Sequence, residues 1–158
     1  MTEYVPEYAK ELVWDGRQDL LDGSRENQSA LVKEQARRIE RLVGKVSVIV
    51  TDSPILLGLL YQKEPYQELK QFAFEKHSAM NNFNLFIKRG NDSAYEQAGR
   101  IHTKEQSVML DEQIHSFLDD HNIFYGTYSR NQAERIAANI RHSIDHNKRF
   151  KESKNQER

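Results

Sequence analysis

The sequence has no cysteine, which excludes a disulfide framework, a thiolate metal site and a cysteine nucleophile. It has no long apolar run either, and no segment approaches the roughly 18 residues of a membrane span. An excess of one charge is also lacking, since 23 Lys and Arg residues stand against 24 Asp and Glu residues. The strongly basic surface that favours nucleic-acid binding is therefore not indicated. We expect a cytoplasmic chain without a secretory signal, because its start is not basic and no apolar run follows.

The composition present is that of a polar but globular protein. Hydrophobic residues make up 37% of the 158 residues and charged residues 30%, a balance that can bury a core. We predict a single α/β domain over residues 1–146. Residues 147–158 are charged and poor in apolar side chains, which predicts a frayed, disordered tail.

Short β-branched or aromatic segments alternate with segments of helical periodicity. The predicted strands are Thr2–Glu7, Lys45–Thr51, Phe83–Ile87 and Ile123–Tyr128. The predicted helices are Tyr8–Trp14, a helix capped by Ser29 and ended by Gly44, Ile55–Tyr61, Gln67–Met80, a helix starting at Thr103, and a last helix from about Ala133 to Ile144. We expect a surface loop over residues 15–28. This alternation predicts a mostly parallel sheet with flanking helices.

Polar residues follow several of these strands. In sheets of this kind, ligands bind at the carboxyl ends of the strands. The groups expected there are Glu7, Asp52 with Ser53, and Lys88 with Arg89. These positions are the first indication of function.

Asp52 stands in VSVIVTDSP, directly after an apolar strand that we expect to be buried on both faces. A carboxylate there can hold Mg²⁺, directly or through water, for phosphoryl transfer. Alternatively, Asp52 only caps the helix that follows. Glu7 has two comparable interpretations, as an acceptor of a substrate proton or as an acid favoured by a helix dipole.

A polar stretch of lid length lies between Lys88 and Thr103. Lys88, Arg89 and Arg100 bracket it, and cations on a closing lid can neutralise charge on a transferred phosphate. The alternative is an ordinary solvated loop. The arginines of the second predicted helix are interpreted mainly as a solvated face.

The order of the motifs carries a resemblance. The chain contains, in sequence, EYVPEYAKELVW, EQARRIERLVGKVSVIVTDSPILLGLLY, NLFIKRG and GRIHTKEQSVMLDEQIHSFLDDHNI. Together they resemble phage and bacterial AAA-type P-loop ATPases related to nucleoside and nucleotide kinases. The resemblance implies Mg²⁺ and ATP as cofactors, with Asp52 as the Walker B acid that holds the metal and Ser53 beside it. It also implies Glu7 as the acid near the acceptor and Arg100 as the lid arginine, with Lys88 and Arg89 near the cofactor.

One part of the family pattern is missing. The sequence contains no G-x-x-x-x-G-K-[ST], and its single Gly-Lys pair, Gly44–Lys45, precedes a strand. In the family this loop follows the first strand, which is central in the sheet. We therefore expect a sheet without its central strand, and a chain that is not an ATP-dependent enzyme by itself.

Two functions remain open. In the first, another chain supplies the phosphate-binding loop, and the completed site transfers phosphoryl from ATP to a nucleotide or nucleoside. In the second, the chain is a non-catalytic protein-binding remnant, such as a phage factor acting on a host protein in the host cytoplasm. A partner's strand or a second copy would then complete the sheet.

Overall fold

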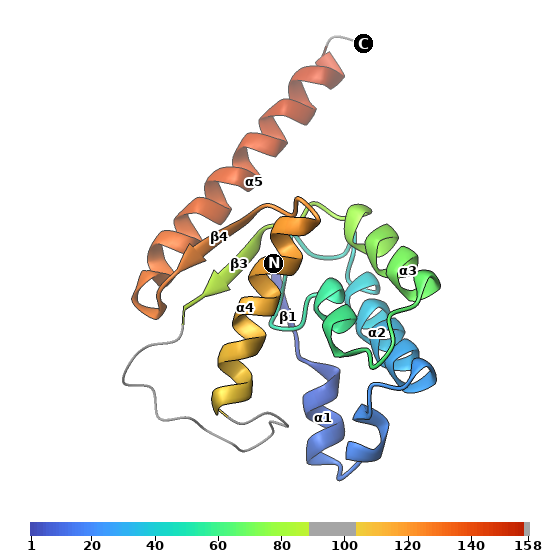
Figure 1. Ribbon diagram of the computed structural model, residues 1–158. Helices are drawn as coiled ribbons and strands as arrows, with labels where there is room; N and C mark the ends of the chain where they lie inside the picture. The colour runs from blue at the N-terminus through green and yellow to red at the C-terminus, as the bar shows by residue number, and fades with distance from the viewer. Residues whose placement is uncertain (89–103, 157–158) are drawn as a thin grey trace. The chain divides into compact units, whose positions relative to one another are not determined.

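The computed structural model describes residues 1–88 and 104–156, which fall into two compact units (Figure 1). Within the described residues, the first unit consists of 1–82 and 104–121. The second consists of 83–88 and 122–156. Arg89 and Arg100, both predicted site residues, lie outside the described residues, as does Thr103.

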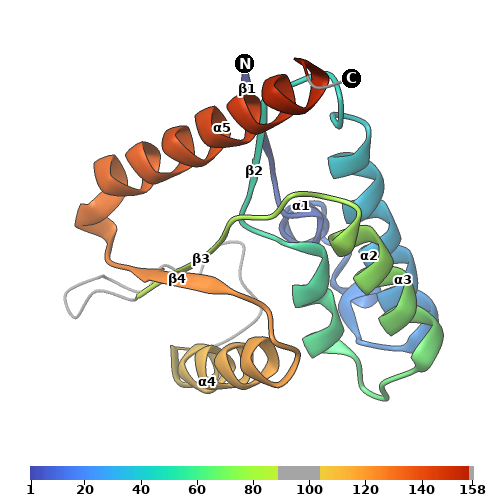
Figure 2. The same cartoon turned by 90° about the horizontal axis from the view of Figure 1, so that it is seen from above.

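The first unit holds one pair of strands and most of the helices. Its elements are β1 Thr2–Val5, α1 Tyr8–Trp14, the 3₁₀ helix η1 Gln18–Leu21, α2 Arg25–Glu40, β2 Val48–Thr51, the 3₁₀ helix η2 Ile55–Tyr61, α3 Gln67–Ser78 and α4 Lys104–Asp120. The strands β1 and β2 run parallel, side by side (Figure 2). Helix α2 contacts both α1 and α3.

The second unit is a parallel strand pair followed by a long helix. It contains β3 Asn84–Ile87, β4 Tyr125–Tyr128, the short 3₁₀ helix η3 Arg130–Gln132 and α5 Ala133–Gln156. The Gln132 side chain accepts a hydrogen bond from the Ser129 backbone N–H at 2.8 Å, which fixes the turn into the helix. Helical backbone continues through 147–156, the segment predicted as a tail, where Lys, Glu and Gln have good helix propensity.

The mixed α/β class and the parallel direction of the strands are confirmed. The strands form two sheets of two strands each, however, rather than the one sheet expected. Within the described residues no ladder joins β2 to β3. The alternation of strands and helices predicts strand direction, but pairing depends on backbone hydrogen bonds between distant segments.

The core of the described chain lies in the first unit. All its fully buried apolar side chains fall between Val5 and Ala73. Helix α2 contributes Val32, Ala36 and Ile39, and α3 contributes Leu69. Burial of each Val, Leu or Ile side chain among them stabilises the fold by about 1.5–3 kcal/mol relative to exposure.

Helix α4 joins this unit through aromatic contacts with α3. The ring centroids of Phe74 and Phe117 lie 6.3 Å apart, and His121 lies 5.1 Å from Phe74 and 4.4 Å from Phe117. These rings therefore pack against one another between the two helices.

The start of α2 corrects the sequence prediction. The N-cap is Ser24, not Ser29, and the expected loop over 15–28 contains η1 and the first helical turn. Gly23 turns the chain at φ +72°, and the Asp22 carboxylate accepts the Ser24 N–H at 2.9 Å. The first buried residue of the helix is Gln28, so its inward face begins with a polar side chain. Apolar periodicity therefore does not mark the first turn of the helix.

The segment after β2 also differs in detail. Ile55–Tyr61 is a 3₁₀ helix, and its apolar side chains Ile55, Leu56 and Leu59 are buried as expected. Strand β2 is not buried on both faces, because Val50 is 45% exposed. Its opposite face packs toward α2, where Gln35 contacts Thr51.

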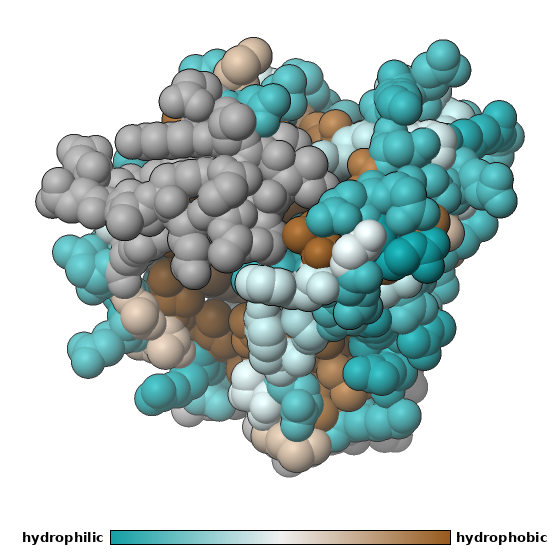
Figure 3. All heavy atoms as spheres, turned by 90° about the horizontal axis from the view of Figure 1, so that it is seen from below, coloured by the Kyte–Doolittle hydropathy of each residue, from teal (hydrophilic) through white to brown (hydrophobic). Residues whose placement is uncertain are grey.

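In the coloured part of the face drawn in Figure 3, hydrophilic residues predominate and apolar residues reach the surface in smaller areas between them. Several large apolar side chains of the described chain are exposed, among them Trp14 and Phe124. No helix in the described part of the chain is both long and apolar enough to cross a membrane.

Candidate functional site at the carboxyl ends of β1 and β2

The register of β1 and β2 places two predicted site residues at the same edge of their sheet. Tyr4 pairs with Val50 and Val5 with Thr51. Because the strands are parallel, both carboxyl ends point the same way. Glu7 follows two residues after β1, and Asp52 follows directly after β2.

Tyr4, near the end of β1, bonds to one of the two carboxylates and lies within the electrostatic influence of the other, although it was not among the predicted site residues. Burial, a hydrogen bond to the Asp52 carboxylate and the charges of Asp52 and Glu7 raise the pKa of the Tyr4 hydroxyl above its usual 10.0. Both carboxylates therefore lie close enough to act on one phenol. The sequence feature that could have identified Tyr4 is a tyrosine in the first predicted strand, near the edge where the acids were expected.

Neither carboxylate serves as a capping side chain. The N-cap of η2 is Pro54, two residues beyond Asp52, and it makes no side-chain capping bond. Glu7 is the N-cap residue of α1, with φ −65° and ψ 119°, and it too makes no side-chain capping bond. Asp52 is exposed and Glu7 is half-buried. Glu7 thus stands at the N-terminus of α1, where a helix dipole favours an acid, and its role toward a substrate stays a prediction, as does that of Asp52 toward a metal.

Hydroxyl groups beside Asp52 shape the turn after β2. The Thr51 Oγ1 accepts the Ser53 backbone N–H at 3.1 Å. It also lies 3.4 Å from the Gln35 Nε2, which donates to it. The turn that presents Asp52 is thus held from both sides.

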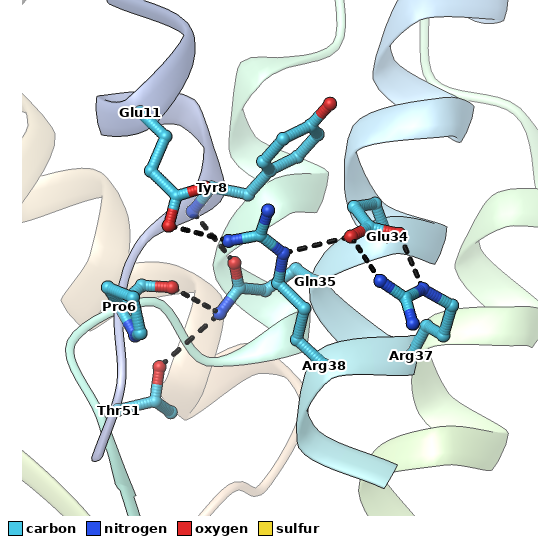
Figure 4. Close-up of polar contacts among 8 residues, drawn as sticks. All are labelled: Pro6, Tyr8, Glu11, Glu34, Gln35, Arg37, Arg38 and Thr51. Atoms are coloured by element: carbon cyan, nitrogen blue, oxygen red, sulfur yellow. Dashed lines mark hydrogen bonds and ion pairs between the residues drawn. The ribbon is translucent and has the colours of Figure 1, made fainter. Parts of the chain in front are cut away.

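Gln35 is the centre of the polar contacts behind this edge (Figure 4). Its Oε1 accepts the Tyr8 backbone N–H at 2.9 Å, and its Nε2 also donates to the Pro6 carbonyl at 3.3 Å. Only 2% of Gln35 is exposed. A buried amide needs such partners, because an unsatisfied polar group costs about 1–3 kcal/mol.

Arg38, one turn further along α2, is paired rather than free for a ligand. Its Nη1 lies 2.7 Å from Glu11 and its Nε 2.9 Å from Glu34, and its guanidinium stacks on the Tyr8 ring at 4.4 Å (Figure 4). Hydrogen bonds from Arg37 and Arg38 lower the pKa of Glu34 to about 2. Arg38 therefore joins α1 to α2 and is not a bare cation at the strand ends.

Lys88 is the one predicted lid cation within the described residues. It follows β3 in the second unit, is exposed, and donates its backbone N–H to the Tyr128 carbonyl at 2.7 Å. The predicted roles of Lys88, Arg89 and Arg100 remain predictions.

The donor set at the edge suits a hard cation. In residues 1–88 and 104–156, no three His, Asp or Glu side chains gather as a ready metal site. Mg²⁺ does not need such a cage, since it binds through one or two carboxylates and keeps water and substrate phosphates as its other ligands. The carboxylate of Asp52, with Glu7 nearby, fits that mode.

A hollow of about 470 Å³ lies elsewhere, over the α4 side chains between Met109 and His121. It includes Glu112 and Phe117 but none of the predicted site residues. The hollow is therefore not part of the candidate site.

Comparison of the chain with protein-family profiles, with curated proteins and with solved structures gives no match. Function is therefore inferred from the sequence and from the geometry of Glu7, Asp52 and their neighbours.

Proposed function

We propose that this chain carries the acidic half of a Mg²⁺-dependent phosphoryl-transfer site, completed by a phosphate-binding strand and loop from another chain. The observation that carries the proposal is the parallel pairing of β1 with β2, which brings Glu7 and Asp52 to one edge beside Tyr4. The resemblance of the motif order to P-loop kinase-like ATPases, including those of phages, points to the same chemistry.

Each residue has a role in the proposed site. Asp52 holds Mg²⁺ directly or through water, and Ser53 stands beside it as a further oxygen donor. Bound Mg²⁺ neutralises charge on the transferred phosphoryl group. Glu7 accepts the proton of the acceptor hydroxyl of a nucleoside or nucleotide. The resemblance implies positive charge from Arg100, Lys88 and Arg89 as well, and these roles stay predictions from the sequence.

The chain does not offer a cradle for a triphosphate by itself. Such a cradle consists of successive backbone N–H groups in a glycine-rich loop, together with a lysine. The sequence contains no such motif. ATP therefore binds productively only when the second component is present.

The test has two parts. Mn²⁺, used in place of Mg²⁺, is expected to broaden the amide NMR signals of residues 7–8 and 52–53, and Asp52→Asn is expected to abolish the effect. Asp119→Asn, an exposed carboxylate of α4, serves as the matched control and leaves it unchanged. Joining the chain to a strand with a G-x-x-x-x-G-K-[ST] loop is then expected to produce ATP-dependent transfer that Asp52→Asn lowers by about a hundredfold or more. Turnover of ATP by the isolated chain would contradict the half-site.

A second candidate function is a non-catalytic strand acceptor. It is supported by β2 and β3, which each pair with a single neighbour in the described chain, and by the exposure of Val50 and Ile87 (45% and 44%). An edge strand presents unpaired N–H and C=O groups that an extended apolar segment of a partner can use. Strand capture without any Mn²⁺ effect at Asp52 would favour this candidate over the first.

A further inference from the structure

Gln35 contacts the backbone on both sides of Glu7. Pro6, whose carbonyl accepts from Nε2, precedes Glu7, and Tyr8, whose N–H donates to Oε1, follows it. The two bonds hold the residue before the carboxylate and the residue after it against one rigid amide. The position of the Glu7 backbone therefore depends on α2.

The same amide reaches the segment that carries Asp52. Nε2 donates to Thr51 Oγ1, and that oxygen also accepts the N–H of Ser53. Thr51 precedes Asp52 and Ser53 follows it, so Gln35 contacts the residue before the second carboxylate directly and the residue after it only through the Thr51 hydroxyl. One side chain thus ties together two strand ends that are 45 residues apart in the sequence, at positions 7 and 52.

We propose that Gln35 is a positioning residue that sets the separation of the Glu7 and Asp52 carboxylates. The chemical role of the two carboxylates rests on the proposed function. The positioning of their backbone by Gln35 does not. A neutral amide suits this position, because it can donate and accept at once and adds no charge beside two acids. Residues bonded directly to metal-binding side chains change metal affinity by about 10–100-fold when replaced, and Gln35 would act on the two acids through the residues beside them.

Gln28 provides a matched control on the same helix. It is 3% exposed, stands seven residues earlier on α2, and its Nε2 donates only to the Gly58 carbonyl in the contacts described, at 2.7 Å. Gln35→Met and Gln28→Met each replace a buried amide by an unbranched apolar chain of similar length. Both variants are expected to lose stability, but only Gln35→Met is expected to affect the strand ends.

Two measurements test the inference. The first is the NMR order parameter of backbone amides at 7–8 and 51–53, expected to fall from about 0.85 to below 0.6 in Gln35→Met and to stay unchanged in Gln28→Met. The second is the Mn²⁺ affinity, read from amide broadening at residues 7–8 and 52–53. It is expected to fall at least tenfold in Gln35→Met and to stay within twofold in Gln28→Met.

The outcomes separate this inference from the proposed function. Unchanged order in Gln35→Met, or equal changes in both variants, would overturn the positioning role. Loss of order in Gln35→Met alone, with no Mn²⁺ binding by the unsubstituted chain, would support positioning and refute phosphoryl transfer. If Gln35→Met does not fold, Thr51→Val removes the contact from the β2 side and is judged by the same two measurements.

Discussion

At the scale of single residues, buried polar side chains decide where the candidate site lies. Gln28 and Gln35 are both nearly inaccessible, and each finds hydrogen-bond partners outside its own helix. In the part of the chain that the structure describes, no buried side-chain nitrogen or oxygen lacks a partner. The interior of the first unit is therefore specified by polar pairing as well as by apolar burial.

The ion-pair cluster around Glu34 predicts a pH dependence. Its pKa falls from the ordinary 4.5 to about 2 in the folded chain, chiefly through hydrogen bonds from Arg37 and Arg38. A lowered folded-state pKa means that the stabilisation is present above pH 4.5 and disappears as the pH falls from 4.5 toward 2. We expect the free energy of unfolding to fall more over that range in unsubstituted protein than in Glu34→Gln. The expected difference is only about 1 kcal/mol, because solvent screens the ion pairs. Urea denaturation at several pH values measures it.

Glu64→Gln is the control for this measurement. Glu64 stands in an exposed segment between η2 and α3, and its replacement removes the same charge. The pH dependence of Glu64→Gln is expected to follow that of unsubstituted protein. A Glu34 pKa near 4.5 in a carboxyl NMR titration would show that the arginine pairs do not form in solution.

At the scale of elements, α2 is the helix on which the first unit is assembled. It contacts α1, α3 and η2. Its apolar residues face the core, while Arg38 and Gln35 reach to the start of α1. The arginines in the second predicted helix were interpreted as a solvated face, and this holds for the exposed Arg37 but not for Arg38, whose side chain is 17% exposed.

The close contact of η2 with α2 predicts that adding one methyl group at Gly58 lowers the stability of the chain. A Cβ placed on Gly58 would overlap the Cγ2 of Val32. We expect Gly58→Ala to destabilise the chain by about 1–3 kcal/mol, as overpacking does. Adding Val32→Ala should restore part of the loss, so that the double variant is more stable than the sum of the single changes predicts. Urea denaturation of the four proteins measures the coupling, and simple additivity would show that η2 moves away at no cost.

At the scale of the whole molecule, the two units differ in how much apolar surface they bury. In the described chain, every fully buried apolar side chain belongs to the first unit. The strands β3 and β4 contain only half-buried and exposed residues. A two-stranded sheet is marginal in water without further packing.

Hydrogen exchange should reveal this difference. Amides of α2 and α3, around Val32 and Leu69, are expected to open only with global unfolding, whereas those of Leu85 and Phe86 in β3 should exchange through cheaper local opening. Native-state exchange followed by mass spectrometry or NMR measures both sets in one sample. If a partner supplies a strand, amide hydrogen exchange should slow in the edge strand with which it pairs. Equal protection of the two units would contradict the argument.

Much of the secondary structure could be predicted from the sequence, and so could the parallel direction of the strands that precede Glu7 and Asp52. Apolar runs and periodicity mark strands and helices because they are properties of neighbouring residues. The errors arose where that signal fails. Ser24 was missed as a cap because the first inward-facing residue of α2 is Gln28, and the helix type of 55–61 depends on its packing rather than on its composition.

The sequence by itself determined the α/β class, the parallel direction of the strands and the placement of Asp52 directly after the second of them. Only the tertiary structure decided that β1 pairs with β2 and β3 with β4, that Tyr4 bonds to Asp52, and that Gln35 bonds to Pro6, Tyr8 and Thr51. Those contacts join residues 16 to 29 positions apart for Gln35. A local pattern carries no information about such partners, because they are selected by the packing of whole elements around a shared core.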